Sequence, residues 1–412
     1  MIYRRALVDS RALMILGARR AQLAAIRTGL KLGLKIVAID PDPTAPGLEL
    51  ATIGLVYDLA DQDAILAEAR EHKIDGIMTM AADYPMPTIG HVCAALDLPG
   101  PHPDAVARAT NKRLMRIALS AAGVRCPRFF HVDSLAQARQ AVSDLGAPVV
   151  FKPAMSQGGR GVTRIPAGCS DAGIERAFLR ALRETRKDDV LVEEFVDGPE
   201  FSIETLTHAG TTKVVAVTDK LTSGAPYFVE LGHNQPSRWS TDQVELLCDT
   251  AIQAVTALGI DRAAGHTEIR LGSSGPVVME VAARLGGGFI TSHLVPFSTG
   301  VDLVAAAIRL AMGAAPDLLP RKEGRAAAVR FLSAPSGVVT RVEGLDAARR
   351  MEGVEEIEIY VQPNDYLGPL MDASGRAGHV ICRAQEPERA ILLAERAMRS
   401  IRILTETGAA TS

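Results

Sequence analysis

Short apolar runs alternate with longer amphipathic stretches over the first hundred residues. The runs ALMILG, KIVAID and GIMTM have the length of buried strands, and apolar residues at helical spacing lead up to residue 32 and follow residue 61. Strands and helices that alternate in this way form a parallel sheet with crossover helices. The pattern therefore predicts an α/β domain with a parallel sheet over residues 1–100.

A cluster of proline and glycine, PGPHP at 99–103, interrupts that alternation and marks the end of the first domain. Apolar spacing then predicts a helical stretch at 104–122 and further helices near 134–145, 170–186 and 240–258. Strands lie between these helices. The middle of the chain is therefore predicted to be α+β and not a second doubly wound sheet.

A second boundary is expected at 316–322. Beyond it AAAVRFL, EIEIYV and HVICRA have the pattern of strands, and residues 387–403 have that of a terminal helix. The chain thus divides into the N-terminal domain, a central α+β domain at 104–316 and a small C-terminal α+β subdomain at 320–412.

The composition is that of a globular protein, with 47% hydrophobic and 23% charged residues. A net charge of −3 gives no basic field for a phosphate backbone, so nucleic acid is not expected as a partner. The five cysteines have no metal-binding or disulfide spacing and are expected to be reduced thiols. The apolar run at 12–16 is too short to span a membrane, so we expect a cytoplasmic protein without a membrane partner.

A glycine-rich loop joins two predicted strands in VVFKPAMSQGGRGV, residues 149–162. Backbone N–H groups of such a loop approach phosphate oxygens closely because glycine has no Cβ, and Lys152 at the end of the first strand reaches an α- or β-phosphate. The residues expected to bind the nucleotide here are Lys152, Ser156, Gly158, Gly159 and Gly161. Taken alone, the pattern fits a plain turn equally well.

A second nucleotide-binding segment is predicted in VLVEEFVDGPEF. Two carboxylates end an apolar strand there, and backbone groups at 194–196 are placed to meet an adenine edge, with Glu193 or Glu200 at a ribose. The residues concerned are Glu193, Glu194, Phe195, Val196 and Glu200. An isolated glutamate pair at a strand end is more often a solvated rim.

A hairpin with two carboxylates is predicted in HTEIRLGSSGPVVMEVAAR. A three-residue loop at 273–275, with Gly275 left-handed, places Glu268 opposite Glu280. Two such carboxylates repel unless a cation such as Mg²⁺ lies between them, and Arg284 adds a fixed charge beside a transferred phosphoryl group. The alternative is a pair of exposed glutamates on a hairpin rim.

Together Lys112, the FKPAMSQGGRG loop, LVEEFV, Glu268 and EVAARLGG resemble an ATP-grasp ligase, in the correct order across the middle of the chain. The resemblance implies two α+β lobes that clamp ATP, with a lid lobe at about 125–195. It also implies that Lys112 and Lys152 contact phosphates and that Glu268 and Glu280 bind Mg²⁺, or Mn²⁺ in its place. The reaction of the family forms an acyl phosphate from a carboxylate.

Many members of the family have Asn where this chain has Ala282, so one metal ligand is missing. A similar Ala-Ala-Arg sequence occurs in the L-amino acid ligases that form dipeptides. The segment DKLTSGAPYFVELGHNQPSR also looks like theirs, which implies that Glu230 binds an α-ammonium group and that His233 orients a substrate group or transfers a proton. Lys220 is expected at a phosphate, and Arg284 at the acyl phosphate and the later oxyanion.

Three hypotheses follow. The first is an ATP-dependent ligase that couples a small-molecule carboxylate, that of an amino acid, to an amine. Because a homodimer is common in the family that the chain resembles, we expect a homodimer. The second is a carboxylase of the same fold that uses bicarbonate, and the third is a nucleotide-binding protein that has lost turnover. We also expect the loop at 156–161 to close over ATP. Whether Tyr227, Phe228, Trp239 and Phe289 line the pocket or the core stays open.

Overall fold

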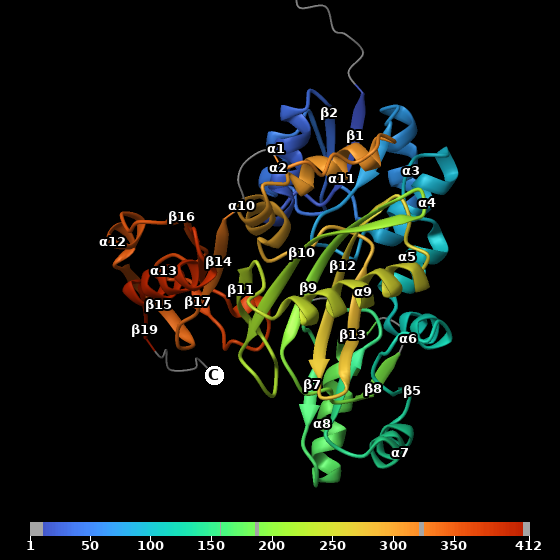
Figure 1. The fold of residues 1–412 in the computed structure, drawn as a ribbon, viewed down its shortest axis with the longest axis vertical. Coiled ribbons are helices and arrows are strands. Elements are labelled where there is room, and N and C mark those ends of the chain that lie inside the picture. Colours follow the sequence, from blue (N-terminus) through green and yellow to red (C-terminus); the bar gives the residue numbers. More distant parts are fainter. Residues whose placement is uncertain (1–10, 157, 186–188, 321–324, 407–412) are drawn as a thin grey trace, which may run out of the picture.

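The computed structural model describes residues 11–156, 158–185, 189–320 and 325–406 (Figure 1). Its N-terminal part is the predicted parallel sheet, in the order β3-β2-β1-β4, with every neighbouring pair parallel. The strands are β1 Ala12–Leu16, β2 Lys35–Ile39, β3 Ile53–Leu55 and β4 Gly76–Met78. The helices of this part are α1 Leu23–Lys31, α2 Pro46–Leu50, α3 Gln62–Glu71 and α4 Met86–Leu96, with the short 3-10 turn η1 Arg20–Gln22 before α1.

A distant segment completes the core of this first sheet. Helix α11, Leu303–Ala311, packs against α1 and β4, and its apolar side chains are buried with Leu13 and Ile15 of β1 (Figure 1). Helix α10, Val295–Thr299, and the π-helical turn η2, Ile290–Leu294, precede it. The N-terminal sheet is therefore not a self-contained unit, because residues more than two hundred positions away supply one of its faces.

The helical stretch predicted at 104–122 is two helices, α5 Pro103–Thr110 and α6 Lys112–Ala121. The break lies at Asn111, whose backbone is extended and whose side chain accepts a hydrogen bond from the backbone N–H of Leu114. This N-cap starts a new helix at Lys112. The first turn of α6 thereby brings Lys112 beside the glycine-rich segment, where its backbone N–H donates to the carbonyl of Ala154.

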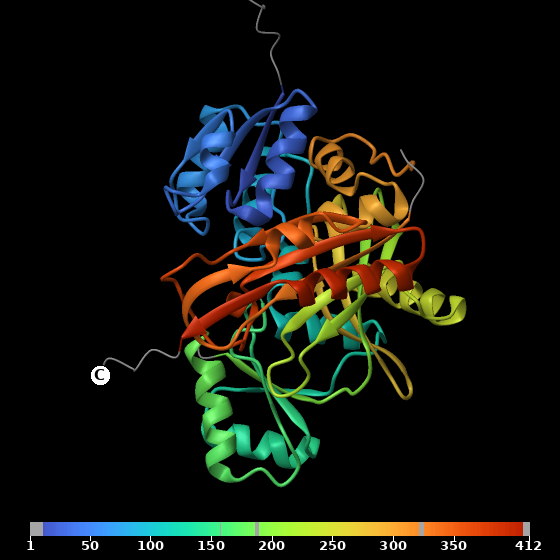
Figure 2. The ribbon, with the colours of Figure 1, turned by 90° about the vertical axis from the view of Figure 1, so that its left-hand side faces the viewer.

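A small antiparallel sheet with two helices projects at one end of the molecule (Figure 2). Its strands, in the order β5-β8-β6-β7, are β5 Phe129–Val132, β8 Val190–Glu194, β6 Val149–Pro153 and β7 Thr163–Ile165. Helices α7 Leu135–Leu145 and α8 Asp171–Arg183 bury one face of the sheet in a separate hydrophobic core. These elements occupy the range expected for a lid lobe.

An eight-stranded antiparallel sheet forms the centre, in the order β13-β12-β9-β10-β11-β14-β18-β16. Its strands are β9 Glu200–His208, β10 Thr211–Thr222, β11 Glu230–Gln235, β12 Ala263–Gly272, β13 Gly275–Ala282, β14 Ala326–Leu332, β16 Val354–Ile359 and β18 Gly378–Ala384. Helix α9, Thr241–Ala257, covers the apolar face of the sheet. The sheet continues across the boundary expected at 316–322, part of which lies outside the described residues.

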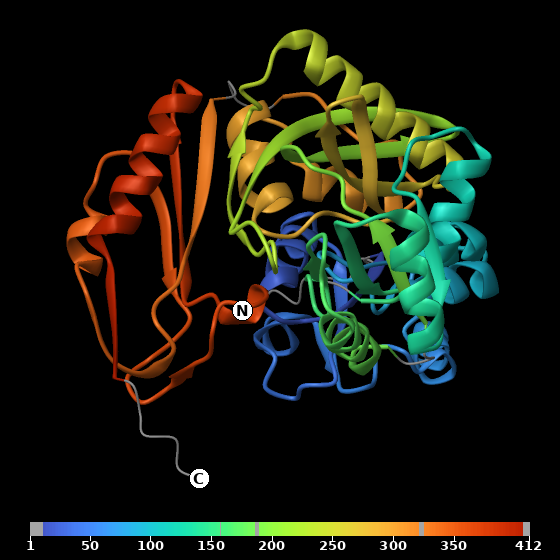
Figure 3. The ribbon, with the colours of Figure 1, turned by 90° about the horizontal axis from the view of Figure 1, so that it is seen from below.

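The C-terminal subdomain stands to one side of this core (Figure 3). It adds β15 Gly337–Glu343, β17 Tyr366–Leu367, β19 Arg402–Glu406, α12 Leu345–Arg349, α13 Pro387–Ser400 and the 3-10 turn η3 Ala373–Gly375. The terminal helix predicted to reach residue 403 is wrong at its end, because α13 stops at Ser400. Residues Arg402–Glu406 instead pair with β15, which buries Ile403.

Among the described residues, no single helix has the length and apolar character needed to cross a membrane. One bent pair, Ile290–Thr299 with Leu303–Ala311, meets those criteria jointly.

Candidate active site

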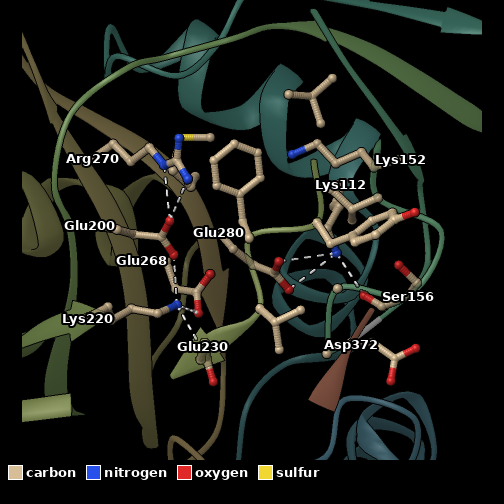
Figure 4. Close-up of a pocket in the computed structure, with 18 of the residues that line it drawn as sticks. Lys112, Lys152, Ser156, Glu200, Lys220, Glu230, Glu268, Arg270, Glu280 and Asp372 are labelled. Carbon is tan, nitrogen blue, oxygen red and sulfur yellow. Dashed lines mark hydrogen bonds and ion pairs between the residues drawn. The ribbon is translucent and has the colours of Figure 1, made fainter. Parts of the chain in front are cut away.

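A cavity of about 220 Å³ opens where the lid sheet, the central sheet and the two terminal parts meet (Figure 4). Every site residue predicted from the sequence lines this cavity except Gly161 and His233. Residues from all parts of the chain contribute, including Asp83 from the N-terminal part and Arg376 from the C-terminal subdomain.

The polar residues of the central sheet share one face. Glu200 and Glu204 alternate along β9 with the buried Phe201 and Ile203, as side chains on a strand do. On the next strand Glu268 lies opposite Ser202, between Glu200 and Glu204 on the same face. The apolar face packs under α9, so the polar face is left to form the floor of the cavity.

Lysines gather at the phosphate end of the cavity. Lys112 Nζ donates to the carbonyl of Ser156 at 2.8 Å and lies 3.3 Å from Glu280 (Figure 4). Lys152 Nζ lies 2.5 Å from Glu193, and burial lowers the pKa of Lys152 to about 8. Lys112 thus contacts the glycine-rich loop directly, and Lys152 lines the same cavity from the strand before that loop.

Glu193 lies beneath Lys152 and is not open toward a ribose. Its carboxylate is 1% exposed and accepts from Arg116 Nε at 2.9 Å and Nη2 at 3.2 Å. Burial would raise the pKa of Glu193, but the Arg116 and Lys152 charges outweigh it and hold that pKa below its usual value. Glu193 therefore positions Lys152, which leaves Glu200 as the ribose candidate of the pair proposed from the sequence.

Aromatic side chains line the other wall of the nucleotide region. Phe195 stacks on Phe228 with ring centroids 5.6 Å apart, and the Arg270 guanidinium lies over the Phe228 ring. Tyr227 and Phe228 line the cavity, whereas Trp239 packs edge-on against Phe201 outside it. The backbone N–H groups of Glu194 and Phe195 already donate to the carbonyls of Arg128 and Pro148.

The glycine-rich loop contains three glycines with positive φ: Gly158, Gly159 and Gly161. A Cβ at Gly158 or Gly159 would meet open space, whereas one at Gly161 would lie 2.8 Å from the Pro153 ring. Gly161 therefore allows the chain to turn back against β6, and the other two face the cavity. The predicted covering loop also includes residue 157, which lies outside the described residues.

Glu268 and Glu280 are paired as predicted, but by a different route. The hairpin loop has two residues, because Gly272 already pairs with Gly275. In that register Glu268 would face Met279. A β-bulge between Glu268 and Ile269 shifts the pairing by one residue and restores Glu268 opposite Glu280.

The paired carboxylates fit a divalent cation by their chemistry. Hard oxygen donors suit Mg²⁺, and the neighbouring Ala282 offers none. Glu268 accepts from Lys220 Nζ at 2.6 Å, and Glu280 lies near Lys112 Nζ. Burial would raise the pKa of Glu268, but the Lys220 charge holds it well below the usual value. Glu268 is therefore an anion, as a ligand must be.

Lys220 joins three carboxylates at the far end of the cavity. Its Nζ lies 2.8 Å from Glu200, 3.0 Å from Glu230 and 2.6 Å from Glu268, and its side chain is 3% exposed (Figure 4). Their combined charge outweighs the effect of burial and raises the pKa of Lys220 well above its usual value. Lys220 therefore organises the carboxylates of this end.

A second bulge brings Glu230 and His233 to the same face. Residues three apart on a regular strand point to opposite faces. In β11 the register with β10 shifts at Leu231, so that Glu230 pairs with Thr222 while His233 pairs with Lys220. His233 Nε2 then lies 3.7 Å from Glu230.

His233 lies behind the cavity and not in it. Its side chain is 1% exposed, and neither ring nitrogen has a hydrogen-bond partner within the described part of the chain. Burial lowers the pKa of His233 to about 3, so the ring is neutral and a poor proton acceptor at neutral pH. It packs edge-on against Phe331 and closely against Gly288. A positioning role for His233 fits better than the proton transfer suggested from the sequence.

Sequence reasoning missed several partners. Arg284 forms a two-pronged ion pair with Asp83, at 2.8 Å for both contacts, and His266 is paired with the buried Glu204. Asp83 follows the last parallel strand, an edge where ligands commonly bind, so that position was a usable signal. Arg376 lies in irregular backbone after η3 and had no such signal.

Comparisons with known proteins agree with this geometry. The family of ATP-grasp domains matches residues 145–293, and the family described as L-amino acid ligase C-terminal domain 2 matches residues 330–406. The chain is 29% identical to the uncharacterized protein y4rH of Sinorhizobium fredii, over 93% of this chain and 80% of that protein. It is 24% identical to human carnosine synthase 1 over 78% of this chain, which spans 42% of that protein.

Two solved structures share the fold over nearly the whole chain. An L-amino acid ligase from Bacillus licheniformis superposes with a TM-score of 0.84 at 24% identity, covering 97% of this chain and 99% of that one. The biotin carboxylase domain of Hydrogenobacter thermophilus 2-oxoglutarate carboxylase was solved with MgADP and bicarbonate. It superposes with a TM-score of 0.74 at 19% identity, covering 96% of this chain and 90% of that one. With an ATP-grasp domain followed by an L-amino acid ligase C-terminal domain, the chain is an ATP-grasp carboxylate–amine ligase that uses ATP with Mg²⁺.

Proposed function

We propose that the protein joins the carboxylate of an amino acid to an amine, forming an amide or dipeptide and releasing ADP and phosphate. The observation that carries this proposal is the position of Glu230. Its carboxylate lies in the same cavity as the metal pair and is linked to Glu268 through one ammonium group, that of Lys220. A carboxylate at this place suits the α-ammonium group of an amino acid whose own carboxylate lies beside the metal pair.

The proposed reaction has two steps. A substrate carboxylate oxygen attacks the γ-phosphorus of ATP; the new O–P bond forms as the bond to the β-phosphate oxygen breaks, and ADP leaves with the electron pair. The amine nitrogen then attacks the acyl carbon. The C–N bond forms, the C–O bond to phosphate breaks, and phosphate leaves with the electron pair and with the proton that nitrogen loses.

The residues of the chain act by position and charge. Lys112 and Lys152 hold the phosphates, and Arg284, fixed by Asp83, neutralises the acyl phosphate and the oxyanion of the second step. Glu268 and Glu280 would hold Mg²⁺, which would supply further neutralisation of phosphate charge. No side chain is required as a nucleophile.

A bicarbonate-dependent carboxylase is the second candidate, because a biotin carboxylase shares the fold. The Glu230 carboxylate argues against it. Bicarbonate has no ammonium group for this carboxylate to bind, whereas an amino acid has one. Dependence of ATP hydrolysis on bicarbonate distinguishes the two candidates.

The experiment that tests the proposal is phosphate release from ATP and Mg²⁺ with all pairs of the twenty amino acids, a set of simple amines, and bicarbonate. We expect release that requires two amino acids and a product whose mass is their sum minus water. Release with bicarbonate alone would assign the protein to the carboxylases instead.

Two further properties belong to the same proposal. The loop at 156–161 closes over ATP, and protection of that loop from protease by Mg²⁺ with a non-hydrolysable ATP analogue tests this. The homodimer expected from the family is tested by light scattering of the purified protein. Cleavage that the analogue leaves unchanged, or a monomeric mass, would contradict the respective statement.

A further inference from the structure

Arg376 reaches the substrate end of the cavity from the C-terminal subdomain. It follows η3 in irregular backbone and lies within the segment that matches the L-amino acid ligase C-terminal domain. Its side chain is 12% exposed, and its guanidinium carbon lies over the Phe331 ring, 3.8 Å from the centroid. Stacking of this kind fixes the plane in which a guanidinium presents its hydrogen-bond donors.

The donors of Arg376 are only partly used. Nη2 donates to the Glu230 carboxylate at 2.9 Å and to the Glu230 carbonyl at 3.0 Å. Nε is buried and has no hydrogen-bond partner within the described ranges. A guanidinium has five N–H donors, arranged to fit the two oxygens of a carboxylate. Among the described residues, Arg376 pairs with one side-chain carboxylate, that of Glu230, which also pairs with Lys220.

Substrate binding would remove that shared partner. If Glu230 turns to the α-ammonium group of the first amino acid, Arg376 loses the one side-chain acceptor that it has within the described ranges. If Glu268 binds the metal, Lys220 loses its closest carboxylate as well. Buried cations left without anions are costly, so the substrate end then requires another anion. The phosphates of ATP would lie at the other end of the cavity, beside Lys112 and Lys152.

Resting on the proposed function, we propose that Arg376 binds the carboxylate of the amine substrate. The second substrate is then itself an amino acid with a free carboxylate, and not a simple amine. Glu230 recognises the ammonium group of the first substrate, and Arg376 recognises the carboxylate of the second. The C-terminal subdomain thereby sets the class of acceptor, while the central sheet activates the donor.

Hydroxylamine separates the two halves of the reaction, because it traps an acyl phosphate as a hydroxamate and carries no carboxylate. The test uses the full chain and a donor and acceptor pair found active in the phosphate-release screen. Three rates are measured for the wild type, Arg376→Ala and Arg376→Lys. They are coupling to the amino acid acceptor, coupling to the amide of that same amino acid, and hydroxamate formation.

We expect the wild type to prefer the free amino acid over its amide by about 30-fold or more, the value of a charged, two-pronged contact. Arg376→Ala should erase this preference by raising the KM of the amino acid acceptor, with hydroxamate formation changed less than about threefold. Arg376→Lys should recover part of the preference, since lysine keeps the positive charge but lacks the planar pair of N–H donors that fits a carboxylate.

Arg20→Ala is the matched control. Arg20 pairs with Glu358 at 2.9 Å and stacks on Tyr360, so it joins the N-terminal part to the C-terminal subdomain without lining the cavity. Its loss should leave the acid-to-amide ratio intact. Equal losses of coupling and hydroxamate in Arg376→Ala, or an unselective wild type, would overturn the inference. A wild type that forms no hydroxamate with any acid would overturn the proposed function itself.

Discussion

The two ends of the cavity are built in different ways. The phosphate end comes mostly from one continuous stretch, β6 and the loop after it, with Lys112 added by the first turn of α6. The substrate end is assembled from β10, β11 and β12, from Asp83 of the N-terminal part and from Arg376 of the C-terminal subdomain. In a continuous segment the functional side chains are close together because they are close in the sequence. A site assembled from several elements depends instead on how distant parts of the chain pack together.

This difference suggests how one fold serves several substrates. The phosphate end binds ATP, whichever carboxylate and amine the enzyme joins. The substrate end can be altered one element at a time, because each element supplies one or two side chains. Variants that affect the two ends separately therefore test the comparison directly.

The largest effect is expected where the two ends meet, at the metal pair. Glu280→Gln keeps the shape but removes one anionic ligand, and we expect overall turnover to fall by about 10²- to 10³-fold. Hydroxamate formation should fall equally, because activation of the carboxylate precedes coupling. A loss confined to coupling would show that Glu280 does not serve the first step. Titration of activity with Mg²⁺ provides the measurement.

Lys152→Met should affect the phosphate end alone. Glu193 keeps its two contacts with Arg116, so the fold is retained, while the KM for ATP rises by about 10- to 100-fold. Steady-state kinetics with ATP and with the carboxylate varied in turn measure both constants. A raised KM for the carboxylate with an unchanged KM for ATP would refute this assignment.

Glu230→Gln is the counterpart at the other end. We expect a KM for the amino acid donor raised by a similar factor of about 10 to 100, with the KM for ATP within about threefold of the wild type. The same kinetic experiment measures both values. Equal changes in the two constants would mean that the ends are coupled through Lys220.

His233, at the substrate end, makes the free energy of unfolding depend on pH. Its folded pKa of about 3 is lower than the ordinary 6.5, so the unfolded state alone takes up a proton as the pH falls below 6.5. Stability is therefore lost between pH 6.5 and 3, and by pH 5 the loss is about 2 kcal/mol. Urea unfolding of the wild type and His233→Phe at pH 7 and pH 5 measures it. A pH slope that the substitution leaves unchanged would contradict the prediction.

The smallest effect is expected at Gly158, and it is best measured against Gly161 in the same glycine-rich loop. Gly161→Ala combines a left-handed backbone with a contact against Pro153, and should lower the free energy of unfolding by about 2 kcal/mol. Gly158 has the same left-handed backbone, but its Cβ would meet open space, so Gly158→Ala should lower the free energy of unfolding by about 1 kcal/mol. Equal costs in chemical denaturation would show that the Pro153 contact is unimportant.

Local signals in the sequence predicted much of this molecule. Short apolar runs marked the strands, a cluster of proline and glycine marked the end of the first domain, and the dense glycines marked the loop beside Lys152. The helix predicted at 104–122 was split because the cap at Asn111 competes with helix continuation. The terminal helix ended early because pairing with β15 buries Ile403, a tertiary gain that no local propensity records.

Local patterns were enough to show which segments form strands and helices and which segment carries phosphate chemistry, because periodicity and glycine density are properties of neighbouring residues. Tertiary structure alone decided the register at the metal pair, where a bulge places Glu268 opposite Glu280, and the shared face of Glu230 and His233. It also decided that Asp83 holds Arg284 and that Arg376 reaches Glu230. Such contacts depend on the packing of whole domains, which short-range patterns do not encode.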